Sequence, residues 1–229
     1  MLIKILDKFF PFLAAILANK EISKETNEKF FKDSKDNWIN RLSSSNFSAQ
    51  DIEKIAHDVY SSQNQRISNI ENKAISLLIA IGLSISLLAI INGFSNDLNI
   101  SQLRWISISI FAIAIIGLVL SAGSAILAYR ISKRFVPTTE EIKEIISNKK
   151  GLIEWAANHL GATELNAKVG LMKSNWVDAA QRQMLFSLIS ISIGSILLIV
   201  DVILSHMPNS ISISISDNLL IFDNATIGT

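Results

Sequence analysis

"AISLLIAIGLSISLLAIING" occupies residues 74–93 and contains no charged residue. A helix rises about 1.5 Å per residue, so this stretch would extend over about 30 Å, the thickness of the hydrocarbon core of a bilayer. It holds eleven Leu and Ile residues. Together they favour insertion into a membrane by about 3–6 kcal/mol. The stretch therefore predicts a transmembrane helix.

Two further apolar runs have the length of a membrane span. Residues 105–129 contain no charge, and residues 184–204 contain only one, Asp201. Trp105 and Tyr129 stand at the two ends of the second run, where aromatic side chains favour the headgroup level. Charged residues make up 18% of the chain, against about 25% in soluble domains. These features predict an all-α membrane protein with three transmembrane helices.

A repeated alternation of Ile and Ser raises the question of strands. It occurs at 106–110, 189–193 and 211–216, and such alternation favours a strand. A lone strand in lipid would leave its backbone groups unpaired, so the first two copies are predicted to be helical. The third copy lies outside the spans, in the tail 205–229. There it could form a β-hairpin with residues 219–222 or remain an unstructured tail.

The basic residues predict the orientation in the membrane. Residues 1–73 carry eleven Lys and Arg, residues 130–183 carry nine, residues 94–104 carry one and residues 205–229 carry none. Cytoplasmic flanks are the ones enriched in Lys and Arg. The N-terminus and the 130–183 segment are therefore expected in the cytoplasm, and the C-terminus outside.

The N-terminal part is expected to be a helical cytoplasmic region. Residues 1–19 place apolar side chains on one helical face and favour an amphipathic helix on the membrane surface. The alternatives are a helix packed on the cytoplasmic region and a hairpin that re-enters the membrane. Residues 20–73 include a second pattern, which begins with Ser48 as the helix cap and continues without Gly or Pro into the first span.

The segment 130–183 predicts a helical cytoplasmic insert made of three pieces. Thr138 can cap a short helix that extends to about residue 148, and Gly151 and Gly161 bracket a second. A third begins near Thr163 and continues into the last span, residues 184–204.

Small residues recur three or four positions apart in all three predicted spans. Such spacing lets helix backbones approach closely, and close packing drives helix association in lipid. These seams serve either packing within one chain or contact with another subunit. They comprise Gly82, Ser86 and Ala89 in the first span, Ala114, Gly117, Ser121 and Ser124 in the second, and Ser187, Ser190 and Gly194 in the third.

Asp201 is the one charge inside a span, three or four residues from its outer end, and Arg104 precedes the second span at the same level. An intramembrane carboxylate is a candidate for function. An outer-leaflet pair of Asp201 with Arg104, or simple hydration of Asp201 at the interface, is the favoured interpretation, and a role in lining a pore or a proton path is the alternative.

The sequence contains no recognisable catalytic, cofactor or metal motif. Cysteine is absent and the three histidines fall in different predicted segments, so no metal site, cofactor site or catalytic group is expected. The net charge of +1 gives no reason to expect a nucleic-acid partner.

Two short motifs flank the predicted spans. The matching residues are Asn72, Lys73, Ala74, Asn166 and Lys173, followed by Ala179 and Ala180. Together with two close spans, a helical insert and one more span, they resemble a group of bacterial membrane proteins that includes the transmembrane effectors of cyclic-nucleotide antiphage systems. The resemblance covers roughly residues 60–200. It implies an oligomeric protein that perturbs the inner membrane when triggered.

The sequence therefore predicts a non-enzymatic protein of the bacterial inner membrane whose partners are the lipid bilayer and further copies of itself. It would act as a defence-type effector that permeabilises the membrane when a cytoplasmic protein or small signal triggers it. The alternative is a membrane anchor or adaptor that recruits a soluble partner without permeation.

Overall fold

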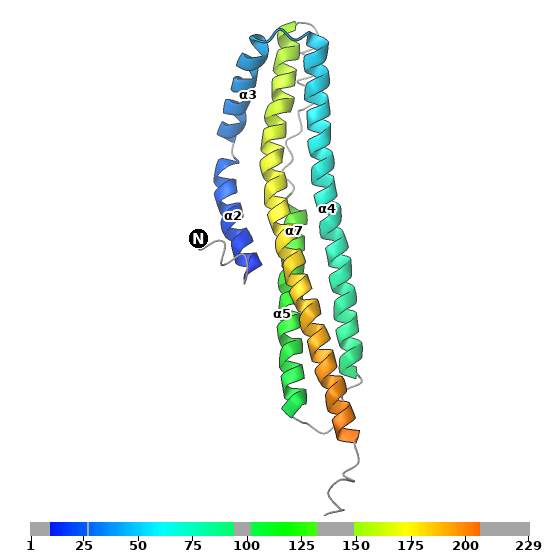
Figure 1. Cartoon of the computed structure of the whole chain (residues 1–229). Coiled ribbons are helices and arrows are strands. Elements are labelled where there is room, and N and C mark those ends of the chain that lie inside the picture. Colours follow the sequence, from blue (N-terminus) through cyan, green and yellow to red (C-terminus); the bar gives the residue numbers. More distant parts are fainter. Residues whose placement is uncertain (1–9, 27, 94–101, 132–148, 207–229) are drawn as a thin grey trace, which may run out of the picture.

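The computed structural model describes residues 10–26, 28–93, 102–131 and 149–206, and these parts of the chain are all-helical. The helices form an elongated bundle (Figure 1). In chain order they are α2 (Pro11–Glu25), α3 (Glu28–Ser43), α4 (Ala49–Gly93), α5 (Gln102–Arg130) and α7 (Lys149–His206).

Three of these helices, α4, α5 and α7, are long and apolar enough to cross a membrane. α4 has 45 residues and α7 has 58, so they extend over about 68 Å and about 87 Å. A bilayer core takes up only about 30 Å of that length. The remainder of α4 and α7 forms a two-helix extension, which we call the stalk (residues 49–73 and 149–176).

The outer surface of the three long helices suits lipid rather than water. In the most apolar stretch of each helix, only 22–33% of the residues are buried inside the protein. Large apolar side chains such as Ile79, Leu83, Ile116 and Leu185 are each more than 60% exposed. Exposing such a side chain to water costs about 1.5–3 kcal/mol, and this cost vanishes when hydrocarbon surrounds the helix. These helices therefore belong in a membrane.

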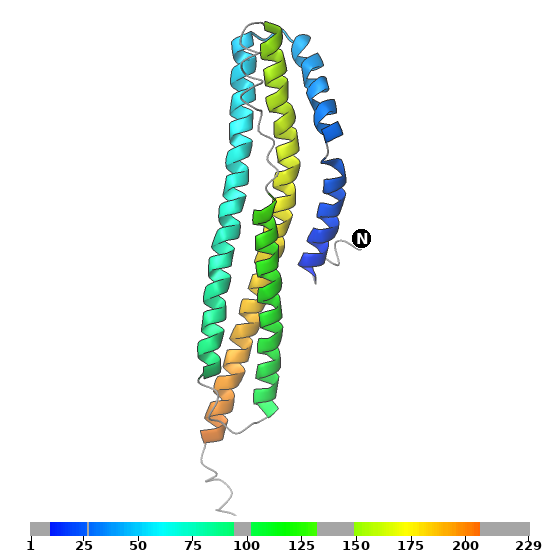
Figure 2. The same cartoon turned by 180° about the vertical axis from the view of Figure 1, so that it is seen from behind.

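α7 is the central pillar of the bundle. It contacts each of the other four described helices, and the views from the front and from behind both show them arranged around it (Figures 1 and 2). Buried residues recur along α7 at seven-residue spacing, the pattern of a helix packed lengthwise on its neighbours. One such column consists of Asn166, Lys173, Ala180, Ser187, Gly194 and Asp201.

α4 runs without interruption from Ala49 to Gly93, as the uninterrupted helical pattern predicts. The predicted cap at Ser48 is present, because its Oγ accepts a hydrogen bond from the Asp51 backbone N–H at 3.2 Å and donates one to the Asp51 carboxylate. Buried Ile52, Ala56 and Ile67 then turn one face of α4 toward its neighbours.

The predicted break in the insert near residue 161 is wrong. Residues 149–206 form one continuous helix, and Gly161 lies inside it. A Cβ on Gly161 would stand 3.4 Å from the backbone nitrogen of Lys35 in α3. Glycine inside a helix costs only about 1 kcal/mol, and here it allows α3 to pack closely. The helix predicted for residues 138–148 lies outside the described residues.

α2 and α3 pack along the stalk. Ring centroids of Phe12 in α2 and Trp176 in α7 are 5.4 Å apart. Trp38 of α3 donates a hydrogen bond to Glu164 of α7 at 3.0 Å. Residues 11–25 thus pack on α7, the position of this helix relative to the membrane surface stays a prediction, and residues 1–9 lie outside the described part. Residues 20–25 form the end of α2, and residues 28–43 form α3.

Serines inside the apolar helices satisfy their hydroxyls within the bundle. Ser109 and Ser192, in the first two Ile-Ser repeats, donate to the carbonyls of Trp105 and Leu188 four residues earlier, both at 2.9 Å. These two repeats are helical, as expected from their place in apolar runs. The third repeat and the predicted hairpin lie outside the described residues.

Candidate functional site at the helix junction

Four helices meet where the apolar run of α4 begins. Their contact is a small apolar cluster built mainly from alanines, with one large side chain at its centre. Because alanine side chains are short, the four backbones approach closely at this level. The buried members are Ala15 of α2, Ala74 of α4, Ala128 of α5, and Trp176, Val177 and Ala179 of α7. We call this region the junction.

A buried ion pair lies beside the junction. Lys173 Nζ of α7 and Glu71 Oε1 of α4 are 2.5 Å apart, and the two side chains are 0% and 18% exposed. Glu71 stands three residues before Ala74, so the pair lies about one helical turn from the start of the apolar run. In its buried column Lys173 stands between Asn166 and Ala180 and is the one cationic side chain. A buried ammonium group needs a partner that neutralises its charge.

This ion pair fixes how α4 sits against α7. Removing two charges from water costs several kcal/mol, and their attraction offsets that cost only in good geometry. Buried pairs of this kind therefore add little net stability, but they make any other register expensive, because either charge would then be buried alone. The pair thus sets the alignment of the two long helices where the stalk meets the spans.

Polar contacts tie α2 to the same turn of α7. Asn19 donates its amide to the carbonyl of Met172 at 3.1 Å, and Asn175 donates its amide to the Asn19 side-chain oxygen at 2.9 Å. Residues 172–176 of α7 therefore contact α2 on one side and α4 on the other. A displacement of α2 would reach the Lys173 turn directly.

The small residues of α5 and α7 fill the space between these two helices. Ser107 donates to the Gly194 carbonyl at 2.7 Å, and Ser121 donates to the Ala180 carbonyl at 2.6 Å. A Cβ on Gly117 would fall on the Ser187 hydroxyl. The remaining seam residues of these spans, Ala114, Ser124 and Ser190, are also buried.

The small residues of α4 have the opposite surroundings. Gly82, Ser86 and Ala89 are exposed, and a Cβ on Gly82 would meet no atom of the described chain within 4 Å. α4 uses a neighbouring face, with Ile81, Ser84 and Leu88 buried, to pack on α5 and α7. One small-residue seam is therefore open on the surface of the protein.

Arg104 and Asp201 lie at corresponding positions of the antiparallel helices α5 and α7. A Cβ on Gly194 would contact the Phe111 ring, and from this crossing both Arg104 and Asp201 are seven residues away toward the same end. The two side chains are 8% and 6% exposed. Their predicted pairing stays a prediction.

The five motif residues divide between interior and surface. Ala74, Asn166 and Lys173 are fully buried, whereas Asn72 and Lys73 are exposed. Glu71, the partner of Lys173, was not predicted from the sequence. A signal for burial was present, because Glu71 lies four residues after the buried Ile67 and three before the buried Ala74, on the same face of the helix. Its partner, however, is 102 residues away in the chain.

The histidines in the described residues do not form a shared site. His159 is buried against Trp155, with ring centroids 4.0 Å apart, while His57 lies on the surface next to Asp58. Among the described residues there is no group of three or more His, Cys, Asp or Glu side chains that could hold a metal ion.

No family model, no curated protein and no solved structure matches this chain.

Proposed function

We propose that this chain is a non-enzymatic membrane protein that assembles with further copies of itself through α4 and perturbs the bilayer when its stalk is engaged from the cytoplasm. The open seam of Gly82, Ser86 and Ala89 carries the proposal, because the other two spans use their small residues inside the chain. Small residues at this spacing drive helix association in lipid.

The stalk offers a route from a cytoplasmic signal to the spans. α4 and α7 each continue from the stalk into a span as one helix, so a shift of either stalk helix is transmitted along its axis. The Lys173–Glu71 pair would keep the two helices in register at rest. A trigger that displaces α2 or α3 would change this register and reorient the α4 seam.

The cytoplasmic position of the stalk follows from charge. α2, α3 and the α4 part of the stalk carry nine of the 21 basic residues, and residues 130–183, which include the α7 part of the stalk, carry another nine. Basic flanks are retained on the cytoplasmic side of a bacterial inner membrane. The proposal therefore places the stalk in the cytoplasm, where a protein or small signal can reach it, and the C-terminus outside.

Enlarging the α4 seam tests the proposal. The double variant Gly82→Leu/Ser86→Leu is expected to fold, because both positions are exposed in one chain, yet to weaken self-association at least about tenfold, or about 1.4 kcal/mol. Cross-linking in membranes measures assembly, and a voltage-sensitive dye in induced cells measures depolarisation. We expect the variant to lose both.

Gly123→Leu is the matched control. A Cβ on Gly123 also meets nothing within 4 Å among the described residues, but this residue lies on α5, away from the α4 seam. The control should assemble and depolarise like the unmodified chain. Equal behaviour of the α4 variant and the control would contradict assembly through α4.

One surface favours the second candidate function, a membrane anchor or adaptor. An apolar groove of about 290 Å³ lies between α3, α4 and α7 in the stalk, and Phe47 and Ile55, which line it, are 60% and 47% exposed. An apolar groove between helices suits the apolar face of a further helix. Two results together would favour the adaptor over the effector. The membrane would stay polarised in every variant, and Ile55→Glu would abolish binding of a helical partner.

A further inference from the structure

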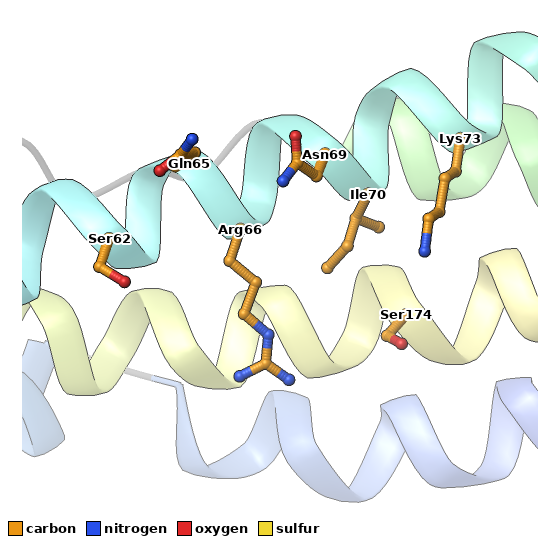
Figure 3. Close-up of a pocket in the computed structure, with 7 residues that line it drawn as sticks. All are labelled: Ser62, Gln65, Arg66, Asn69, Ile70, Lys73 and Ser174. Carbon is orange, nitrogen blue, oxygen red and sulfur yellow. The ribbon is translucent and has the colours of Figure 1, made fainter.

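A second groove lies between α4 and α7 just before the apolar run of α4 (Figure 3). Its volume is about 600 Å³, and its lining is mostly polar. Arg66 and Lys73 extend from α4 toward α7, and Ser174 faces them from α7 (Figure 3). Ser62 and Asn69 complete the polar wall on the α4 side.

Among the described residues, the groove is positively charged and has no internal counter-ion. None of the described lining residues carries a carboxylate, and neither Arg66 nor Lys73 forms an ion pair with any residue that the structure describes. Two acids beside the groove, Glu71 and Asp178, have other partners. Glu71 is paired with Lys173, and Asp178, which lines a smaller adjoining groove, is 2.9 Å from Arg182. An anionic ligand would therefore meet two available cations.

The groove also has the right depth for a lipid headgroup. Lys73 directly precedes Ala74, the first residue of the apolar run, so with this run in the bilayer the proposed function places its ammonium group at the membrane surface. Arg66 is seven residues earlier, about 10.5 Å further from the bilayer along the helix axis. Basic pockets between helices at this level bind the headgroups of anionic lipids.

We propose that this groove binds phosphate groups, and that its ligand is the headgroup of an anionic phospholipid carrying two phosphates, one held at Lys73 and the other toward Arg66. Hydroxyl and amide groups of Ser62, Asn69 and Ser174 would donate the remaining hydrogen bonds. Two separated phosphates match two cations that stand two helical turns apart. This proposal rests on the membrane placement of the spans in the proposed function and does not require self-association.

Lipid titration tests this site. Cardiolipin, whose headgroup carries two phosphates, is titrated into the full chain in neutral detergent, and native mass spectrometry gives the apparent Kd. Each basic residue near a membrane surface contributes about a fivefold change in affinity. The double variant Arg66→Gln/Lys73→Gln is therefore expected to raise the Kd about 30-fold.

Two comparisons separate a specific site from general charge. Lys24→Gln/Lys54→Gln removes the same charge from exposed positions elsewhere in α2 and α4, and should leave the Kd within about twofold. The conservative Lys73→Arg should also retain binding. If the groove variant and this control shift the Kd equally, or if neither shifts it, the proposal is overturned.

A further arm distinguishes the two sources of phosphate. Inorganic pyrophosphate is added to the protein in phosphatidylcholine nanodiscs. If the ligand is a lipid, pyrophosphate should not bind, and cardiolipin binding should depend on Arg66 and Lys73. If pyrophosphate binds and the groove variant abolishes its binding, the phosphate site stands and its source is soluble rather than lipid.

Discussion

Lys173→Met is expected to destabilise the protein by about 3–5 kcal/mol, the cost of leaving one member of a buried ion pair without its partner. Methionine has nearly the length of lysine, so it fills the same space next to α4. What changes is the carboxylate of Glu71, which is 18% exposed and loses the ammonium group 2.5 Å away. For a chain of this size, the melting temperature should fall by roughly 6–20 °C.

A second substitution separates the lost charge partner from lost packing. In Lys173→Met/Glu71→Leu both charges are absent, and such replacements are neutral or stabilising by about 1–4 kcal/mol. The melting temperature in detergent should therefore return to that of the unmodified chain or exceed it. A double variant as unstable as Lys173→Met would show that the ion pair does not explain the loss.

The exposed pair on the same helix is the matched control. Arg182 and Asp178 are 2.9 Å apart and about half exposed, and exposed pairs of this spacing contribute about 0.3–0.5 kcal/mol. Arg182→Met should therefore leave the melting temperature nearly unchanged. A comparable loss in both methionine variants would mean that charge in general, rather than the buried pair, stabilises the protein.

Gly194→Ala is expected to have the second largest effect, a destabilisation of about 1–3 kcal/mol from overpacking. The added Cβ would stand 2.8 Å from a ring carbon of Phe111, with two more ring atoms at 3.1 Å. An aromatic ring between two closely packed helices cannot move aside without shifting its backbone. Thermal unfolding in detergent measures the loss.

Gly117 and Gly123, both on α5, provide a graded comparison. Gly117→Ala should cost less than Gly194→Ala, because the conflicting atom is the Ser187 hydroxyl, which can rotate. Gly123→Ala meets nothing within 4 Å among the described residues, so the better helix propensity of alanine should stabilise it by up to about 1 kcal/mol. The reverse order of the three variants would contradict the close packing of α5 on α7.

The spans and the continuity of α4 could be predicted because their signals are local. A run of apolar residues such as 74–93 must be helical in lipid whatever surrounds it, and α4 has no glycine or proline between Ser48 and the span to end it. The break at Gly161 was predicted from an equally local signal. It is absent because the contact with α3, which no local pattern records, accommodates the glycine within the helix.

The site depended on pairings between helices, and these could be predicted only in part. Gly82 and Gly117 belong to seams with the same spacing, yet one is open and the other faces Ser187. The difference lies in which face each helix turns inward, and that is decided by helices distant in sequence. For the same reason Lys173 could be singled out from its motif, whereas Glu71 could not be identified as its partner.

The orientation of the spans is the claim on which the proposed function depends most directly. The chain contains no cysteine, so single cysteines can be introduced without background. Ser61 in the stalk and Ser205 at the opposite end of α7 are both exposed. In intact cells treated with a membrane-impermeant maleimide, Ser205→Cys should be labelled and Ser61→Cys should be labelled only after lysis. Labelling of Ser61→Cys in intact cells, with Ser205→Cys protected until lysis, would contradict a cytoplasmic stalk and the function proposed from it.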